Sequence, residues 1–503
     1  MSRTKTPIFI AERRIYLEPF QYDYLERRMR ICNKIYNTAV KHYAKAVELL
    51  REDLWYKKAL SRFRASKTEE ESREWSTELF ACMEAYGLTE YGIHEYVGYQ
   101  KKHAFNGSIN IDAVQKLGTN LYASVKKAVF SNTTIHFRKF GQTSSFEGKK
   151  ANSAIIFNKA KDTVRVFGLE LKLKPIRDKD TYLREAMEHK VKYCRIVRKP
   201  FKNSYRYFVQ FALEGNSPKT VTLGNGRCGL DIGTSTVAYY NDTEAGFNAL
   251  ADGVEKYEQN IRKASVKYER RLRLANPSCY DENGVPIKGR KPTNRTKGSR
   301  RALMELKNTY RLKQVFIKLS HNALANRITK QCSVIIKEPM DFRKLAARAK
   351  NTARQQRQDA IKAKDGTIKF VHKYKKKKRF GKSIGRRAPG QFIQTLTGKI
   401  ERGGGYVFDV NPQLYKASQY NHITQTAVKP SLSERTKKIG SHTVQRDLYS
   451  SFLLYNSYDE NSIDFKSCAS LFSDFLKKQS CVISKIQSIG DTTNNFGLKA
   501  FSI

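Results

Sequence analysis

An acidic residue interrupts an apolar segment near the middle of the chain. The segment 226-GRCGLDIGTSTVAYYN-241 has the β-branched and aromatic residues of two short strands, and Gly-Thr after Ile232 predicts a tight turn between them. Asp231 lies where the pattern would otherwise have an apolar residue. A carboxylate at such a position costs free energy unless it is paired or bound to a cation. The fold must therefore give Asp231 a partner.

Two kinds of site use a strand-end acid of this type. A metal-dependent nuclease needs a carboxylate on the central strand of an RNase H-like sheet, and an actin-like ATPase uses an Asp-x-Gly-Thr turn to hold nucleotide phosphates. The ATPase also needs a second phosphate turn, but the nearest candidate, 402-RGGGYVFDV-410, has its glycines before the strand and its acid after it. There is no GxxxxGK[ST] loop either. The sequence therefore favours the nuclease, with the ATPase as an alternative.

The net charge predicts a polyanionic partner. The 503 residues include 95 Lys and Arg against 47 Asp and Glu, which gives a charge of +48. A compact protein with this much self-repulsion is best explained by binding to nucleic acid, whose neutralised phosphates release counterions. The sequence contains no apolar run of roughly 18 residues or more, and we expect no signal peptide. We therefore expect no membrane partner and a cytoplasmic, nucleoid-associated prokaryotic protein.

The eight cysteines are scattered, and no two have C-x-x-C spacing. This argues against a zinc site and against a disulfide framework. We therefore assume no zinc and expect reduced thiols.

Hydrophobic periodicity predicts a mainly helical start, a β-rich middle and a mixed C-terminal half. The predicted helices are 21–50, 56–80 and 109–130, the last with Asp112 as N-cap, followed by 254–275, 300–328 and 444–456. The predicted strands of the middle region are 133–140, 153–160, 162–168, 169–175, 192–199 and 205–213. Further strands are predicted at 332–342, which ends at Glu338-Pro339, and at 404–412.

The segment 341–390 is strongly basic, with 18 Lys and Arg and three Asp and Glu. A solvated loop or a nuclear import signal has such a composition. In a chain of this charge, we expect the segment to contact phosphates instead. The candidate nucleic-acid-binding residues are Arg343, Lys344, Arg348, Lys373, Lys375, Lys376, Arg379, Arg386 and Arg387.

Three carboxylates stand out in the C-terminal half because each lies in or beside an apolar element. They are Asp231, Glu338 at the end of a predicted strand, and Asp447 near the start of a predicted helix. Hydrolysis of a phosphodiester by two metal ions needs several acids from different elements around ions about 4 Å apart. Carboxylates suit Mg²⁺ better than zinc, and Mn²⁺ is also possible. We therefore predict that all three residues are catalytic and hold two Mg²⁺ ions.

The order of these parts resembles the TnpB family of transposon-encoded RNA-guided nucleases and the compact type V CRISPR effectors. The segments that carry the resemblance are 30-RICNKIYNTAV-40, GLDIGT at 229–234, IIKEPMDFRKL at 335–345, 406-YVFDVNPQLYKASQ-419 and QRDLYSSFLL at 445–454. The segments at 229–234, 335–345 and 445–454 are similar to the family's three RuvC motifs. The segment at 406–419 is similar to another motif of the family, "V-d-P-x-y-T-S-Q".

The sequence departs from the family in two places. The family usually has two C-x-x-C pairs between the fourth segment and the Arg-Asp, whereas here Asn421 and Thr424 fall near the first pair and 436–447 has no cysteine. We therefore expect the zinc ribbon, at about 412–443, to be degenerate or lost. The family's Asn two residues after the last Asp is replaced by Tyr449, while the acid itself is present.

The resemblance implies an α+β multidomain architecture. Residues 1–15 and 131–222 would form a wedge-like β-barrel, residues 16–130 a helical recognition lobe, and residues 223–456 an RNase H-like (RuvC) α/β nuclease domain with helical insertions. Residues 457–503 would be a C-terminal tail of unknown role.

The resemblance also implies a function, an RNA-guided DNA endonuclease with guide RNA and target DNA as partners. Such a protein recognises a short target-adjacent motif, opens the duplex by RNA pairing and cleaves in the RuvC site, with one or two copies per guide. The sequence leaves three alternatives open. They are an RNA-guided binder that does not cleave, a guide-free RNase H-fold resolvase, and the actin-like ATPase.

Overall fold

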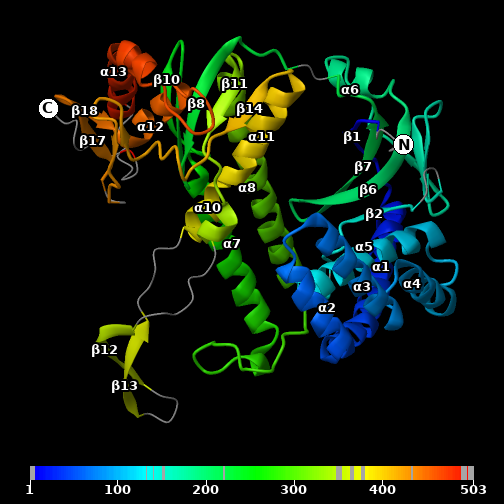
Figure 1. The fold of residues 1–503 in the computed structure, drawn as a ribbon. Helices are drawn as coiled ribbons and strands as arrows, with labels where there is room; N and C mark the ends of the chain where they lie inside the picture. The colour runs from blue at the N-terminus through cyan, green and yellow to red at the C-terminus, as the bar shows by residue number, and fades with distance from the viewer. Residues whose placement is uncertain are drawn as a thin grey trace. The chain divides into compact units, whose positions relative to one another are not determined.

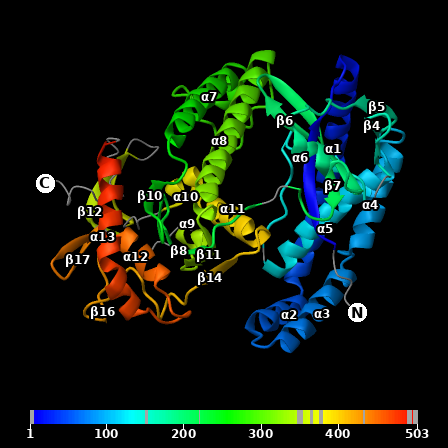
Figure 2. The same ribbon diagram turned by 90° about the horizontal axis from the view of Figure 1, so that it is seen from above.

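The computed structural model describes residues 6–131, 133–139, 141–149, 153–218, 221–346, 354–362, 367–374, 380–431, 434–488 and 496. The chain divides into two units, residues 1–219 and 220–503 (Figures 1 and 2). Helices and β-sheets occur in both units, as the sequence predicts. Within the described residues, no helix combines the length and the apolar character that crossing a membrane requires.

The helices of the first unit are α1 (Pro19–Glu52), α2 (Leu54–Ala65), α3 (Glu69–Ala85), α4 (Glu90–Ala104), α5 (Ile111–Ser131) and α6 (Thr181–Ala186). The helices predicted at 21–50 and 109–130 are confirmed as α1 and α5.

Two details of the helix prediction are wrong, both at helix starts. The single helix predicted at 56–80 is broken, because the Thr68 hydroxyl accepts from Glu71 N at 3.2 Å and a capping box begins α3 there. Asp112 is not the N-cap of α5. Its backbone N–H donates to the Asn110 side chain at 2.7 Å, so Asn110 caps the helix and Asp112 lies in the first turn.

The strands of the first unit are β1 (Ile8–Arg14), β2 (Ser145–Glu147), β3 (Ile155–Asn158), β4 (Thr163–Val166), β5 (Leu169–Lys172), β6 (Val191–Phe201) and β7 (Ser204–Glu214). They form an antiparallel four-stranded sheet in the order β1-β7-β6-β2 and a three-stranded sheet in the order β3-β4-β5. An isolated bridge between Ile15 and Leu173 joins the ends of the two sheets. The closed barrel stays a prediction.

The strand predicted at 133–140 is absent from its described part, residues 133–139. The backbone at Arg138 pairs with a side chain and not with a strand. Arg138 N donates to Asn37 Oδ1, and Asn37 Nδ2 donates to Arg138 O, both at 2.8 Å. An amide side chain of α1 thus replaces a neighbouring strand as the hydrogen-bond partner.

A buried ion pair links α1 to the larger sheet of this unit. The Arg198 guanidinium on β6 donates to the Glu26 carboxylate on α1 and, at 2.7 Å, to Thr143 O. Tyr207 on β7 donates to the same carboxylate at 2.6 Å. The Arg198 side chain is only 3% exposed, so its charge depends on Glu26 for compensation.

Replacing Glu26 by alanine is expected to destabilise the protein by about 3–5 kcal/mol, because it leaves the buried Arg198 charge unpaired. The measurement is the free energy of urea unfolding of the full chain. The control is Glu188→Ala, which breaks a pair with Lys159 whose side chains are 74% and 62% exposed. An exposed pair contributes roughly 0–1 kcal/mol. Equal losses in the two variants would contradict the role given to Glu26.

The second unit is built on a five-stranded sheet in the order β10-β9-β8-β11-β14. The strands are β8 (Gly226–Ile232), β9 (Thr236–Asn241), β10 (Ala245–Ala249), β11 (Cys332–Lys337) and β14 (Tyr406–Asp409). The pairs β8–β9 and β9–β10 are antiparallel, whereas β11 runs parallel to both β8 and β14. β8 is therefore the central strand of a mixed sheet.

Helices cover both faces of this sheet (Figure 1). One face packs on α8 (Lys297–Thr329) and α11 (Pro389–Arg402), through residues such as Leu230. The other face packs on α12 (Arg446–Tyr455) and α13 (Phe465–Ser488), through residues such as Tyr240. The other helices of this unit are α7 (Val254–Leu274), a 3-10 turn (Pro277–Cys279), α9 (Phe342–Ala346) and α10 (Gly381–Arg387). Its other strands form three hairpins: β12 (Arg354–Lys362) with β13 (Ile368–Tyr374), β15 (Tyr420–Asn421) with β16 (Thr426–Ala427), and β17 (Thr436–Ile439) with β18 (His442–Gln445).

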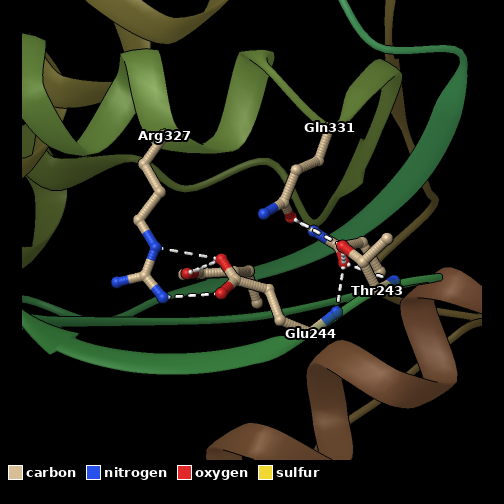
Figure 3. Close-up of polar contacts among 6 residues, drawn as sticks. Thr243, Glu244, Arg327 and Gln331 are labelled. Atoms are coloured by element: carbon tan, nitrogen blue, oxygen red, sulfur yellow. Dashed lines mark hydrogen bonds and ion pairs between the residues drawn. The ribbon is translucent and has the colours of Figure 1, made fainter.

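A polar network fastens α8 to the turn between β9 and β10 (Figure 3). The Arg327 guanidinium donates to both carboxylate oxygens of Glu244, at 3.0 and 2.6 Å. Beside this pair, Gln331 Oε1 accepts from Asn241 at 2.6 Å and from Thr243 at 3.0 Å. A bidentate pair of this kind fixes orientation as well as distance. The network therefore fixes the position of the C-terminal end of α8 relative to the β9–β10 turn.

Two segments are more ordered than the sequence predicts. The basic segment 341–390 is not simply a loop, because it contains α9, β12, β13 and α10. The segment 457–503, predicted as a tail, contains α13, whose Cys468 and Phe475 are buried in the core with α12. Residues 465–488 therefore belong to the core of this unit, and the role of 457–503 stays open.

Candidate active site

Asp231 lies at the C-terminal end of β8, and its direction follows from strand geometry. Successive side chains of a strand point to opposite faces, so Asp231 shares a face with Gly229, two residues earlier. That face is covered by α12, which comes so close that a Cβ on Gly229 would lie 2.0 Å from Ser451 O. Asp231 therefore points toward α12. Its neighbour on β9 is Ala238, whose small side chain leaves space beside the carboxylate.

Glu338 reaches the same place from the adjacent parallel strand. In the register of β11 and β8, Ile336 is opposite Gly229 and Lys337 is opposite Leu230. The next residue, Glu338, therefore lies level with Asp231 and on the same face. Glu338 Oε1 accepts from Ala417 N at 3.1 Å, which fixes the carboxylate. The carboxyl ends of neighbouring parallel strands are a common position for a ligand site.

Asp447 comes from the first turn of α12. Gln445 caps this helix, because its side chain accepts from Leu448 N at 2.7 Å, while its own N–H donates to Gln479 of α13 at 2.8 Å. The positive end of the helix dipole favours a carboxylate in the first turn. The end of β18, through Gln445, and α13, through Gln479, thus fix the start of the helix that holds Asp447 over the sheet.

The structure brings the three predicted carboxylates together in one cavity of about 560 Å³. Residues that also line it include Ala238, Ser383, Ala417, Arg435, Arg446 and Ser450. Burial raises the pKa of Asp231 well above its usual range, and the nearby carboxylates of Asp447 and Glu338 raise it further. Burial also raises the pKa of Glu338, against the effect of the Ala417 N–H. This concentration of negative charge favours a bound cation.

Two arginines that were not among the predicted site residues face Asp447. Arg446 donates to Asp447 Oδ1 from Nε at 3.2 Å and from Nη2 at 3.1 Å, and Arg435 Nη1 lies 3.7 Å from Oδ2. Within the described ranges, no group of three His, Cys, Asp or Glu side chains lies close enough together to hold one metal ion. The acids thus share a cavity, but Asp447 is paired with arginine. In the sequence, the Arg-Asp motif points to Arg446 as a neighbour of Asp447, whereas no motif points to Arg435.

The predicted nucleic-acid-binding residues have different environments. Arg343 and Lys344 lie exposed on α9, and Arg386 lies on α10 with Nε 3.9 Å from Glu258. Arg387 donates to Leu250 O at 2.6 Å and to Glu255 at 2.8 Å, contacts that hold α10 to the fold. Lys373 belongs to β13, but its side chain is not described, and Arg348, Lys375, Lys376 and Arg379 lie outside the described residues. Phosphate contact by these residues stays a prediction.

The region where the zinc ribbon was expected, about 412–443, contains the hairpins β15–β16 and β17–β18. Lys437 of β17 joins them by donating to Gln419 O at 2.7 Å and to Tyr420 O at 2.5 Å. Tyr449, which replaces the family's Asn, joins this region to α12, because its hydroxyl lies 2.7 Å from His422 Nδ1 and accepts from His422 N at 3.1 Å. Hydrogen bonds and aromatic packing therefore connect the hairpins without cysteines.

Comparisons with known proteins show only weak similarity, and only to solved structures. No family model matches the chain, and no curated protein matches it. Two similar solved structures are a Cas12f1–sgRNA–target DNA complex, with TM-score 0.39, 9% identity and coverage of 90% of this chain and 99% of that chain, and a CRISPR-Cas12f ternary complex, with TM-score 0.24, 9% identity and coverage of 89% and 86%. Superpositions of this quality establish neither a shared fold nor a shared activity. The site geometry is the stronger basis for a function.

Proposed function

We propose that this protein is an RNA-guided DNA endonuclease that cleaves DNA at the cavity of Asp231, Glu338 and Asp447. One observation carries the proposal. Three carboxylates from a central strand, the end of its parallel neighbour and the first turn of a covering helix line one cavity. A metal-dependent nuclease of the RNase H type needs an acid on the central strand, and Asp231 has that position on β8.

The donor chemistry of the cavity fits Mg²⁺ or Mn²⁺. All three residues are carboxylates, the ligands that hard cations prefer, and no described Cys or His belongs to the set. Because Asp447 is paired with Arg446 and Arg435, its carboxylate must exchange these partners to bind an ion. Two Mg²⁺ ions, when bound, would supply an activated water and stabilise the leaving oxygen. Zinc is not part of the proposal.

The protein's own side chains contribute binding and orientation. Glu338 is held by the Ala417 N–H, so its second oxygen is free to face the cavity. Arg446 is anchored by donating to Glu434 O at 2.7 Å. With Asp447 bound to an ion, the Arg446 and Arg435 guanidinium groups would remain beside the cavity and would be available to bind a DNA phosphate.

Guide RNA and target DNA are the proposed partners, because the charge of +48 far exceeds what one cleavage site needs. A protein that holds an RNA–DNA heteroduplex reads its shape and backbone, so basic residues on many elements are expected. The resemblance to TnpB and compact type V effectors supports the same partners. The barrel, recognition lobe and RuvC assignments are part of this proposal.

The experiment has two steps. The full chain is purified from its source cells, and the copurifying RNA is sequenced to define a guide. The complex is then given a plasmid with a matching target, in Mg²⁺ or in EDTA. We expect cleavage that needs both the match and Mg²⁺. RNA without cleavage would identify a guided binder, and the absence of RNA would leave a guide-free resolvase or an ATPase.

A further inference from the structure

Two adjacent buried serines on α12 differ in what their hydroxyl groups do. Ser450 is 1% exposed and Ser451 is fully buried. The Ser451 hydroxyl donates to Leu448 O at 2.7 Å, within its own helix, as serines in helices commonly do. The Ser450 hydroxyl belongs to the few buried side-chain groups in the described residues that have no hydrogen-bond partner.

A buried hydroxyl without a hydrogen-bond partner costs free energy, and an alanine at this position would avoid that cost. Alanine also has the higher helix propensity. The position of Ser450 indicates what the hydroxyl is for. It lies one helical turn after Asp447, on the same side of α12, and it lines the cavity that contains Asp231.

The two elements that carry these groups are held in tight contact. Gly229 allows α12 to lie directly on β8, with Ser451 O 2.0 Å and Tyr455 N 2.3 Å from the position of a Cβ. Ser450 and Asp231 line the same cavity beside this close contact between helix and strand. A hydroxyl has one proton to donate, and a carboxylate has further lone pairs for a cation.

We propose that the Ser450 hydroxyl is a positioning group that donates to Asp231 and orients its carboxylate toward the divalent cation of the active site. This inference rests on the proposed nuclease function. Hydrogen bonds to ligating carboxylates typically affect metal affinity by about 10- to 100-fold. Ser450→Ala is therefore expected to weaken the binding of Mn²⁺ by about that factor.

The test is a Mn²⁺ titration of the full chain, followed by the electron paramagnetic resonance of free Mn²⁺, so it needs neither guide nor DNA. Ser451→Ala is the matched control, because it removes a hydroxyl that bonds only within the helix. We expect weaker Mn²⁺ binding in Ser450→Ala, unchanged binding in Ser451→Ala, and tighter binding in Ser450→Thr than in Ser450→Ala. In cleavage with the copurified RNA, Ser450→Ala should need a higher Mg²⁺ concentration than Ser451→Ala to reach half of its own maximal rate.

The outcomes separate the two proposals. Equal Mn²⁺ affinity in Ser450→Ala and Ser451→Ala overturns the role of Ser450 alone, whether both are unchanged or both are weakened. If the parent chain binds no Mn²⁺, or Asp231→Asn binds it as tightly as the parent, the metal site itself is wrong and both proposals fail.

Discussion

Asp231→Asn is expected to abolish DNA cleavage while the protein still binds its guide RNA and the matching DNA. Asparagine has almost the shape of aspartate but lacks the charge that a divalent cation needs. The expected loss in rate is about 10³-fold or more, at the upper end of what removing one transition-state-stabilising group costs. The measurement is single-turnover cleavage of a matched target, with a filter-binding assay for the DNA.

The same variant should be more stable than the parent when metal is absent. Burial and the carboxylates of Asp447 and Glu338 raise the pKa of Asp231, so its charge opposes folding at neutral pH. A neutral asparagine removes this repulsion, and the melting temperature in EDTA is expected to rise. Asp281→Asn, on an exposed loop of the same unit, is the control and should change neither property. Full-rate cleavage by Asp231→Asn would exclude this residue from the site.

Gly229→Ala is expected to damage both stability and cleavage, although it adds only one methyl group. The methyl would lie 2.0 Å from Ser451 O and 2.3 Å from Tyr455 N, which are backbone atoms that cannot rotate away. Overpacking of this kind typically costs about 1–3 kcal/mol or more. If α12 moves to relieve the contact, Asp447 moves away from Asp231. A displacement of about 1 Å in an active site can lower the rate about 100-fold.

The matched control is Gly398→Ala in α11, where a Cβ would have no heavy atom within 4 Å. Alanine in a helix interior is favoured over glycine by about 1 kcal/mol, so this variant should be as stable as the parent or more so. Thermal unfolding and guide-dependent cleavage are measured on both variants. A Gly229→Ala protein with the parent's melting temperature and cleavage rate would mean that α12 does not depend on this close approach.

The core of the site could be predicted because its determinants are local in sequence. Asp231 interrupts an apolar strand, Glu338 ends one, and Asp447 begins a helix, and each is a pattern over a few residues. The resemblance supplied the link between them. That all three share a cavity depends on the pairing of β8 with β11 and on Gly229, and strand register is not a local property.

The features that were missed depend on contacts between distant segments. Residues 133–139 contain strand-forming residues, but Asn37 of α1 satisfies the Arg138 backbone instead of a neighbouring strand. Ser450 and Arg435 have no motif, and only the folded arrangement brings them beside the acids. For α13 a signal existed, because Cys468, Phe472, Phe475 and Ile483 follow helical spacing.

The packing of α13 limits how far this chain could be shortened for compact delivery. The helix supplies Gln479, which accepts from the backbone of the residue that caps α12, and Asp474, which accepts from the Tyr240 hydroxyl at 2.7 Å. A version that stops at residue 456 would expose the apolar side of α12 to solvent and loosen the helix that carries Asp447. An engineer seeking a smaller gene should therefore remove residues from another part of the protein.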